Sequence, residues 1–222
     1  NLIFPNSKTP IDVLPNMPIG GWSGWPYAIG SAMLLTNAFG EKISTYCLLD
    51  SDYYPDEVVQ KRYAEAKEKN VTLHIWKKKE IENYLIVSPV IERIVKKNDK
   101  KKLVLSISID KKIEEITDEL KDQTIDCLSQ EFYNFDRSKG IAAANKKARD
   151  FVKNNWSNVS ERLRIVSGKK VISKLSSWLQ EEVNVSFSSS TLLYEIERHE
   201  LDKEVISVVK AIENSTKFQQ LK

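Results

Sequence analysis

Residues 47–57 decide the fold, and they read CLLDSDYYPDE. The apolar run over 43–49 predicts a strand that ends directly at an acidic pair, Asp50 and Asp52. Pro55 then suits the first turn of a helix, because a proline lacks an N–H that the first turn does not use. The stretch therefore predicts a strand, an acidic turn and a helix in immediate succession.

The same alternation extends on both sides of this stretch. Residues 71–76 alternate apolar and polar side chains as a strand does, and residues 27–39 are apolar and helix-like. A short apolar run at 11–14 predicts one more strand ahead of them. The order strand, helix, strand, helix, strand favours an α/β fold with a parallel sheet flanked by helices, since each helix is long enough for a crossover.

The rest of the chain predicts mostly helices. A basic run at 96–102 is typical of a solvated loop, and 103–109 alternates as a strand does. We expect helices over 110–135, 141–156, 168–179, 190–198 and 202–213, and a returning core strand at 163–166. These elements divide the chain into a core over 1–95, a mostly helical insertion over 96–162, and the returning strand with C-terminal helices over 163–222.

Acidic side chains follow two predicted strand ends. Glu82 comes 32 residues after Asp50 (82 − 50), which is the length of one strand–helix–strand step. The carboxyl ends of parallel strands meet at one edge of a sheet, so we expect Asp50, Asp52 and Glu82 to lie close together. Mg²⁺ prefers oxygen ligands and needs only one or two carboxylates plus water and phosphate. An Asp-x-Asp pair is weak evidence alone, but its place after a strand and the later glutamate favour a metal site.

Composition excludes several other classes of protein. The 222 residues carry a net charge of only +3, which is too mild to establish a nucleic-acid partner. Two separate cysteines, Cys47 and Cys127, argue against a zinc site and suit a reducing compartment. No apolar run approaches the roughly 20 residues that cross a membrane, and no signal peptide is visible. We therefore expect a cytoplasmic protein without a membrane partner.

Three motifs resemble one known family. The acidic stretch CLLDSDYYPDE, the later KKKEIENYL at 77–85 and the preceding IDVLPNMPIGGW at 11–22 resemble the Toprim domain of OLD-family nucleases. The segment VSGKKVISKLSSWL at 166–179 is similar to that family's late glycine–lysine motif at a helix start. The resemblance covers about residues 11–87 and 163–200, and it implies a Toprim fold, which is a Rossmann-like parallel sheet with a mostly helical insertion and C-terminal helices.

The resemblance also implies an activity. OLD-family proteins join an ATPase to a C-terminal Toprim endonuclease that cuts DNA with Mg²⁺ or Mn²⁺, and many serve in antiviral defence, including retron-linked members. By position, Asp50, Asp52 and Glu82 resemble the ligands of a two-metal site. Lys169 resembles the catalytic lysine, with Glu82 also acting in catalysis. Glu80 is expected in a supporting position beside them.

The implied partners are DNA, an N-terminal ATPase domain that would supply ATP binding, further copies of the chain, and reverse transcriptase with its msDNA if the protein is retron-linked. Toprim domains also carry a glutamate on their first strand, and residues 1–10 contain none. We therefore expect this chain to be a C-terminal fragment. A catalytically incomplete Toprim module acting in assembly or sensing, or another Toprim enzyme of the topoisomerase or primase type, stays open as an alternative.

Two basic regions stay open to more than one interpretation. Lys77, Lys78 and Lys79 are candidate DNA contacts, although a solvated strand end is about equally expected. Basic residues also interleave with aromatic residues further along, and for those aromatics core packing is the favoured interpretation. That second group comprises Arg137, Lys139, Lys146, Lys147 and Arg149 among Phe132, Tyr133, Phe135 and Trp156. Trp22 and Trp25 flank Gly24 in the glycine loop and could cover the site, but packing in the core is the favoured interpretation.

Overall fold

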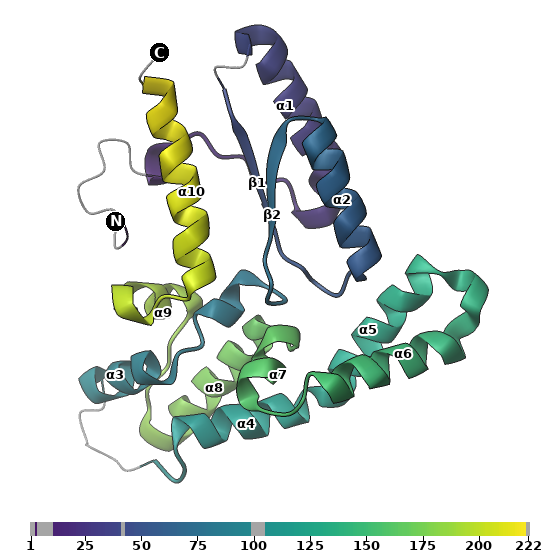
Figure 1. The fold of residues 1–222 in the computed structure, drawn as a ribbon. Coiled ribbons are helices and arrows are strands. Elements are labelled where there is room, and N and C mark those ends of the chain that lie inside the picture. The colour runs from purple at the N-terminus through teal and green to yellow at the C-terminus, as the bar shows by residue number, and fades with distance from the viewer. Residues whose placement is uncertain (1–2, 4–10, 41–42, 99–104, 221–222) are drawn as a thin grey trace. The chain divides into compact units, whose positions relative to one another are not determined.

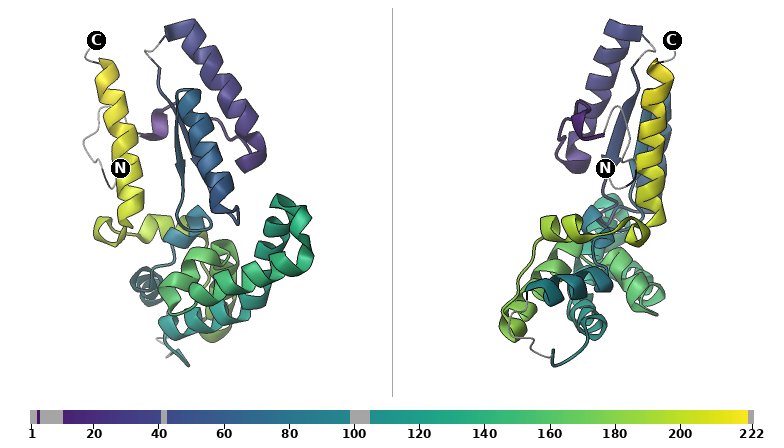
Figure 2. Two further views of the ribbon diagram at one scale, coloured as in Figure 1. Left: turned by 45° about the vertical axis from the view of Figure 1, so that its right-hand side comes forward. Right: turned by 90° about the vertical axis from the view of Figure 1, so that its left-hand side faces the viewer.

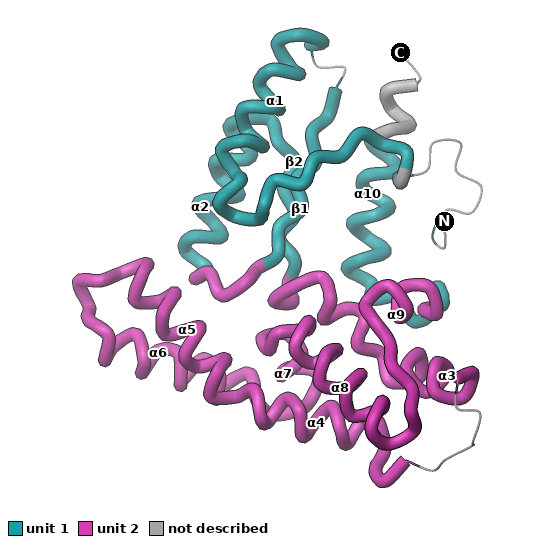
Figure 3. Tube along the Cα trace, turned by 180° about the vertical axis from the view of Figure 1, so that it is seen from behind, with its two compact units in different colours: residues 1–50, 56–76, 197–222 teal, residues 51–55, 77–196 magenta. Residues whose placement is uncertain are grey.

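A computed structural model describes residue 3 and residues 11–40, 43–98 and 105–220. Contacts within the chain divide it into two compact units, coloured separately in Figure 3. The first comprises residues 1–50, 56–76 and 197–222, and the second comprises 51–55 and 77–196. These units group the chain differently from the three segments expected from its sequence. The described residues are mostly helical and contain one small parallel sheet, which is compatible with an α/β fold.

The first unit is built on two parallel strands (Figure 1). β1 (Thr45–Leu49) pairs in parallel with β2 (Val71–Ile75), with Thr45 opposite Val71 and Leu49 opposite Ile75. The connection between them is α2 (Asp56–Glu68), as the sequence predicted. The backbone N–H of Ile75 donates a hydrogen bond to the Tyr63 hydroxyl at 3.0 Å, which ties this helix to the strand. The predicted strand–helix–strand step is confirmed.

Two further helices run beside these strands (Figure 2). α1 (Trp25–Phe39) follows the short 3₁₀ turn η2 (Gly21–Gly24), and α10 (Lys203–Gln220) follows the 3₁₀ turn η6 (Arg198–Glu200). Trp22 and Trp25 are buried, and the Arg62 guanidinium lies 5.4 Å and 5.0 Å from the centres of their rings. The prediction that both tryptophans pack in the core is therefore confirmed.

The second unit is helical. It begins, after the loop at 51–55, with the 3₁₀ turn η4 (Ile81–Tyr84), and its helices are α3 (Ser88–Asn98), α4 (Ile109–Glu119), α5 (Lys121–Phe135), α6 (Gly140–Asn154), α7 (Val159–Ile165), α8 (Gly168–Val183) and α9 (Ser189–Glu195). The 3₁₀ turn η5 (Arg137–Lys139) joins α5 to α6. α4 and α8 are in contact, and each buries apolar residues three and four apart: Ile109, Ile113 and Ile116 on α4, and Val171, Leu175 and Leu179 on α8.

Two expected strands are helical instead. The run at 11–14 forms the 3₁₀ turn η1 (Ile11–Val13), closed by a hydrogen bond from Leu14 N–H to the Ile11 carbonyl at 3.1 Å. Residues 163–166, expected as the returning core strand, lie mainly in α7. That helix begins because the Asn158 side chain caps it, accepting a hydrogen bond from Glu161 N–H at 3.0 Å. Apolar runs of about four residues fit either period, so these predictions were wrong.

Three other boundaries differ from prediction. In the expected strand over 103–109, residues 103–104 lie outside the described residues, 105–108 form no strand, and Ile109 begins α4 behind its cap Ser108. The helix expected over 110–135 divides at Leu120 into α4 and α5. The loop expected over 96–102 is helical through Asn98, and its remainder lies outside the described residues.

Within the part of the chain that the structure describes, no helix is both long and apolar enough to span a bilayer.

Candidate functional site

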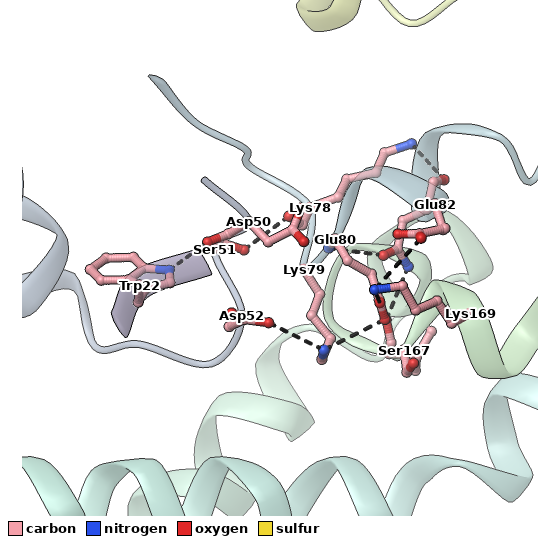
Figure 4. A network of polar contacts seen from close by, with 12 residues as sticks. Trp22, Asp50, Ser51, Asp52, Lys78, Lys79, Glu80, Glu82, Ser167 and Lys169 are labelled. Carbon is pink, nitrogen blue, oxygen red and sulfur yellow. Dashed lines mark hydrogen bonds and ion pairs between the residues drawn. The ribbon is translucent and has the colours of Figure 1, made fainter. Parts of the chain in front are cut away.

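The predicted site residues fall in both units. Asp50 directly follows β1 in the first unit, where its backbone carbonyl accepts a hydrogen bond from the Trp22 indole at 2.7 Å. The remaining predicted residues belong to the second unit: Asp52, Lys77, Lys78, Lys79, Glu80, Glu82 and Lys169. Figure 4 shows the polar contacts among most of them.

The acidic turn is held by the backbone of the segment before η4. Asp52 N–H donates to the Lys79 carbonyl at 2.9 Å, and the Ser51 hydroxyl donates to the Lys78 carbonyl at 2.9 Å. Asp52 adopts a left-handed backbone conformation, with φ of 48°, which aspartate tolerates better than most residues. These bonds fix Asp52 at the edge of a group of paired charges, which we call the acidic cluster and which comprises Asp52, Lys79, Glu80, Glu82 and Lys169. Of the Asp52 side chain, 45% stays exposed.

Lys79 points into the cluster rather than outward. Its Nζ lies 3.6 Å from Asp52 Oδ1 and 3.5 Å from Glu80 Oε1. It also lies 4.7 Å from the centre of the Tyr53 ring. Only 13% of the side chain is exposed. Of the three lysines considered as DNA contacts, Lys79 is thus engaged with two carboxylates, Lys78 lies over the Tyr84 ring, and Lys77 is exposed.

Glu80 stands at the start of η4 and closes a capping box with Asn83. The Glu80 side chain accepts from Asn83 N–H, and Asn83 Oδ1 accepts from Glu80 N–H at 3.1 Å. The role of Asn83 could not be predicted from the sequence, because the usual capping box begins with Ser or Thr and has Glu or Gln three residues later, which is the reverse of Glu80 and Asn83. The box orients the buried Glu80 carboxylate and the next acidic residue of the turn, Glu82, whose side chain is 17% exposed.

Asn83 also joins η4 to the turn between α7 and α8. It is fully buried, and its Nδ2 donates to the Leu163 carbonyl at 2.8 Å and to the Val166 carbonyl at 3.0 Å. Gly168 permits this approach, because a Cβ there would lie 2.6 Å from Asn83 N. The start of α8 is therefore seated directly against η4.

Lys169 consequently reaches both glutamates. Its Nζ lies 3.3 Å from Glu80 Oε2 and 3.6 Å from Glu82 Oε1, while 62% of its side chain remains exposed. Ser167 caps α8 by accepting a hydrogen bond from Lys170 N–H. Residues predicted to act together from distant parts of the sequence, Glu82 and Lys169, thus contact one another.

The charges around Glu80 favour its ionised form. Burial raises the pKa of the Glu80 carboxyl, but a hydrogen bond from Ser167 and the positive charges of Lys79 and Lys169 together outweigh burial. The net result is a pKa below the usual value for glutamate. The start of α8 adds to this effect, because the N-terminal end of a helix carries partial positive charge.

This lowered pKa predicts a pH dependence of stability. A group whose pKa falls on folding stabilises the protein above its unfolded value, about 4.3 for glutamate, and this contribution disappears as the pH drops through the folded value. We therefore expect the stability difference between wild type and Glu80→Gln, measured by urea unfolding, to shrink steadily below about pH 4.5. The matched control is Glu181→Gln, an exposed position on α8, which should show no such trend. A Glu80→Gln difference that is constant with pH would contradict the assignment.

The donor chemistry of the cluster suits a hard divalent cation. Glu82 Oε2 is buried without a hydrogen-bond partner, and so is Glu80 Oε1, although the latter lies near Lys79 Nζ. Carboxylate oxygens are the ligands that Mg²⁺ and Mn²⁺ prefer. Among the described residues, no three His, Cys, Asp or Glu side chains are gathered closely enough to hold a metal ion by themselves. A cation held by one or two carboxylates together with water and phosphate is compatible with this arrangement.

Comparisons of the chain with protein-family models, with curated proteins and with solved structures found no match.

Proposed function

We propose that this chain is a metal-dependent DNA endonuclease module of the Toprim type. The observation that carries the proposal is the contact between Glu82 and Lys169, 3.6 Å apart and 87 residues apart in sequence (169 − 82). Metal-dependent hydrolysis of a phosphodiester uses acidic groups that hold divalent cations, and it is helped by a positive group near the charge that develops on phosphate. The cluster places carboxylates and a partly exposed lysine together on the second unit.

Each residue has a distinct part in this proposal. Asp52 and Glu82 would hold Mg²⁺ or Mn²⁺. For Asp50, which belongs to the first unit, a role as a metal ligand rests on the sequence pattern alone. When bound, one or two such ions activate a water molecule and neutralise phosphate charge. Lys169 places its ammonium group where the scissile phosphate gains negative charge. Glu80 and Lys79 orient their neighbours, Glu80 by contacting Lys169 and Lys79 by bridging Asp52 to Glu80.

The wider setting of the proposal rests on the resemblance to OLD-family nucleases. It comprises an N-terminal ATPase domain that binds ATP, assembly with further copies, a role in antiviral defence in the cytoplasm, and reverse transcriptase with msDNA if the protein is retron-linked. Whether or not the protein is retron-linked, its proposed substrate is DNA.

A module without catalytic activity, acting in assembly or sensing, is the second candidate. The observation that favours it is charge pairing: each of the three carboxylates of the cluster lies within 3.6 Å of a lysine ammonium group. Such pairs can stabilise a fold without any bound cation. The two candidates therefore differ in whether the acidic residues are needed for cleavage or only for stability.

Plasmid nicking by the purified full-length protein separates them. We expect cleavage in Mg²⁺ or Mn²⁺ that stops in EDTA, and a loss of about 100-fold or more in Asp52→Ala, because metal ligands and charged catalytic groups contribute on that scale. Asp126→Ala, on the exposed side of α5, is the matched control and should cleave normally. Full metal-dependent cleavage by Asp52→Ala would show that the site assignment is wrong. A wild-type protein that is inactive with either metal would favour the assembly candidate.

A further inference from the structure

One strongly basic segment of the chain lies on the hairpin formed by α5 and α6. Residues 137–153 contain six basic residues and one acidic residue, Asp150, so their net charge is +5. The whole chain carries only +3, and the remainder of it is therefore slightly acidic. Such a concentration of one sign on one element is what a polyanionic partner requires.

The basic side chains of α6 line one face of the helix. Lys146, Arg149 and Lys153 are spaced by three and four residues, which places them on one side of a helix. The residues that α6 buries are Ala144, Ala148 and Val152, which lie on the side facing α5. The three cations are all exposed. We call these three residues the α6 basic stripe.

No hydrogen bond or ion pair joins the stripe's side chains to any other residue in the described part of the chain. Elsewhere in the second unit many basic residues are paired, as Lys174 is with Glu119 at 2.9 Å and Lys97 with Glu195. The stripe thus offers three exposed positive charges over a rise of about 10 Å, taking roughly 1.5 Å per residue, and one carboxylate, that of Asp150, lies on the same side of the helix. That length corresponds to about three phosphates along one DNA strand, which rise about 3.4 Å each.

The surroundings of the stripe suit a nucleic-acid backbone. Ala142 and Ala143, one turn before Lys146, are exposed and small, so a phosphate chain can approach the helix closely. Phe135 and Ile141 flank the tip of the hairpin with 48% and 52% of their surfaces exposed, where apolar side chains can contact bases or sugars. An anionic membrane is a poorer fit, because the apolar face of α6 is already buried against α5 and cannot insert.

The root of the hairpin adjoins the acidic turn. Tyr53, the residue after Asp52, hydrogen-bonds to Thr124 in the first turn of α5, and Thr124 is itself buried. We infer that the α6 basic stripe binds the phosphate backbone of DNA, as a binding surface distinct from the acidic cluster. Non-catalytic binding along α6 would hold a duplex whose continuation can reach that cluster.

Binding of a fluorescein-labelled DNA duplex, followed by anisotropy in EDTA over a series of KCl concentrations, tests this inference. In Lys146→Gln/Arg149→Gln/Lys153→Gln we expect affinity to fall at least tenfold. The slope of log affinity against log salt should decrease by about 3, close to one for each phosphate that the variant no longer binds. The control, Lys61→Gln/Lys67→Gln/Lys203→Gln, removes the same charge from exposed lysines of the first unit and should bind as wild type does.

Several results would overturn the inference: no binding of DNA by wild type, unchanged binding by the α6 variant, or an equal loss in the control. Binding to phosphatidylserine vesicles in preference to the duplex would also overturn it. As a control, circular dichroism spectra of the α6 variant should match those of the wild type, which would show that the variant is folded. Because EDTA prevents metal-dependent cleavage, binding that persists in Asp52→Ala supports the inference even if the proposed nuclease activity fails.

Discussion

Replacing Asn83 with alanine is expected to lower the free energy of unfolding by about 3 to 5 kcal/mol, among the larger effects of a single substitution. The side chain is fully buried, and both polar atoms of its amide are hydrogen-bonded. Nδ2 donates to the carbonyls of Leu163 and Val166, and Oδ1 accepts from Glu80 N–H. Alanine leaves two carbonyls and one N–H without partners. A buried polar group without a partner costs about 1–3 kcal/mol each.

Urea unfolding followed by circular dichroism measures this effect. Asn83→Asp keeps the size of the side chain but replaces a donor with a carboxylate facing two carbonyl oxygens, so it should be at least as destabilising as alanine. The matched control is Asn155→Ala, whose exposed amide donates to the Phe151 carbonyl at 2.9 Å and which should cost less than about 1 kcal/mol. Equal losses at positions 83 and 155 would refute the role given to Asn83.

The parallel strand pair and most helices could be predicted from the sequence because their signals are local. The side chains of β2 alternate between apolar and polar, and β1 is followed directly by the acidic turn. α2 begins after Pro55, with Asp56 and Glu57 at the positive end of its dipole. α8 shows the same consistency between its apolar spacing and its start at Ser167. In these segments length, period and capping all point to one structure.

Short apolar runs could not be assigned in the same way. Four residues at 11–14 or 163–166 span about one helical turn or half a strand, so periodicity does not separate the two. At 163–166 the side chain of Asn158 decides the outcome by capping α7, and the cap lies outside the apolar run itself. The division at Leu120 could not be predicted for a similar reason. The apolar pattern continues from α4 into α5, and the backbone at Leu120 ends the first helix without a signal in that pattern.

The candidate site was predictable in its residue types but not in its construction. Acidic residues after strand ends and a lysine at a helix start are visible as motifs, and Glu82 and Lys169 do meet. The burial of Lys79 between two carboxylates could not be predicted, because three consecutive lysines in a sequence suggest three solvent-exposed side chains. The packing of Gly168 on Asn83 was not visible either, since it joins segments 85 residues apart (168 − 83) that share no period.

Lys169→Met should reduce metal-dependent plasmid cleavage by about 100-fold to 1000-fold, the effect of removing one group that stabilises transition-state charge. Methionine keeps the length and flexibility of the side chain and removes only the charge. Lys169→Arg keeps the charge, so it should retain more activity than methionine even though arginine presents its donors differently. Lys170→Met is the matched control, because Lys170 is the adjacent exposed lysine on α8 and its nicking rate should be unchanged.

A second measurement distinguishes catalysis from support of the fold. Lys169 Nζ lies 3.3 Å and 3.6 Å from the two glutamates that would attract a cation, so the lysine and the cation repel one another there. Mn²⁺ binding to Lys169→Met, measured by calorimetry, should therefore be as tight as in wild type or tighter while cleavage falls. If Lys169 only neutralised these glutamates, its loss would lower the unfolding free energy and leave the cleavage rate of the folded fraction intact. Weaker Mn²⁺ binding together with slower cleavage would instead mean that Lys169 shapes the metal site, and its assignment to phosphate charge would be wrong.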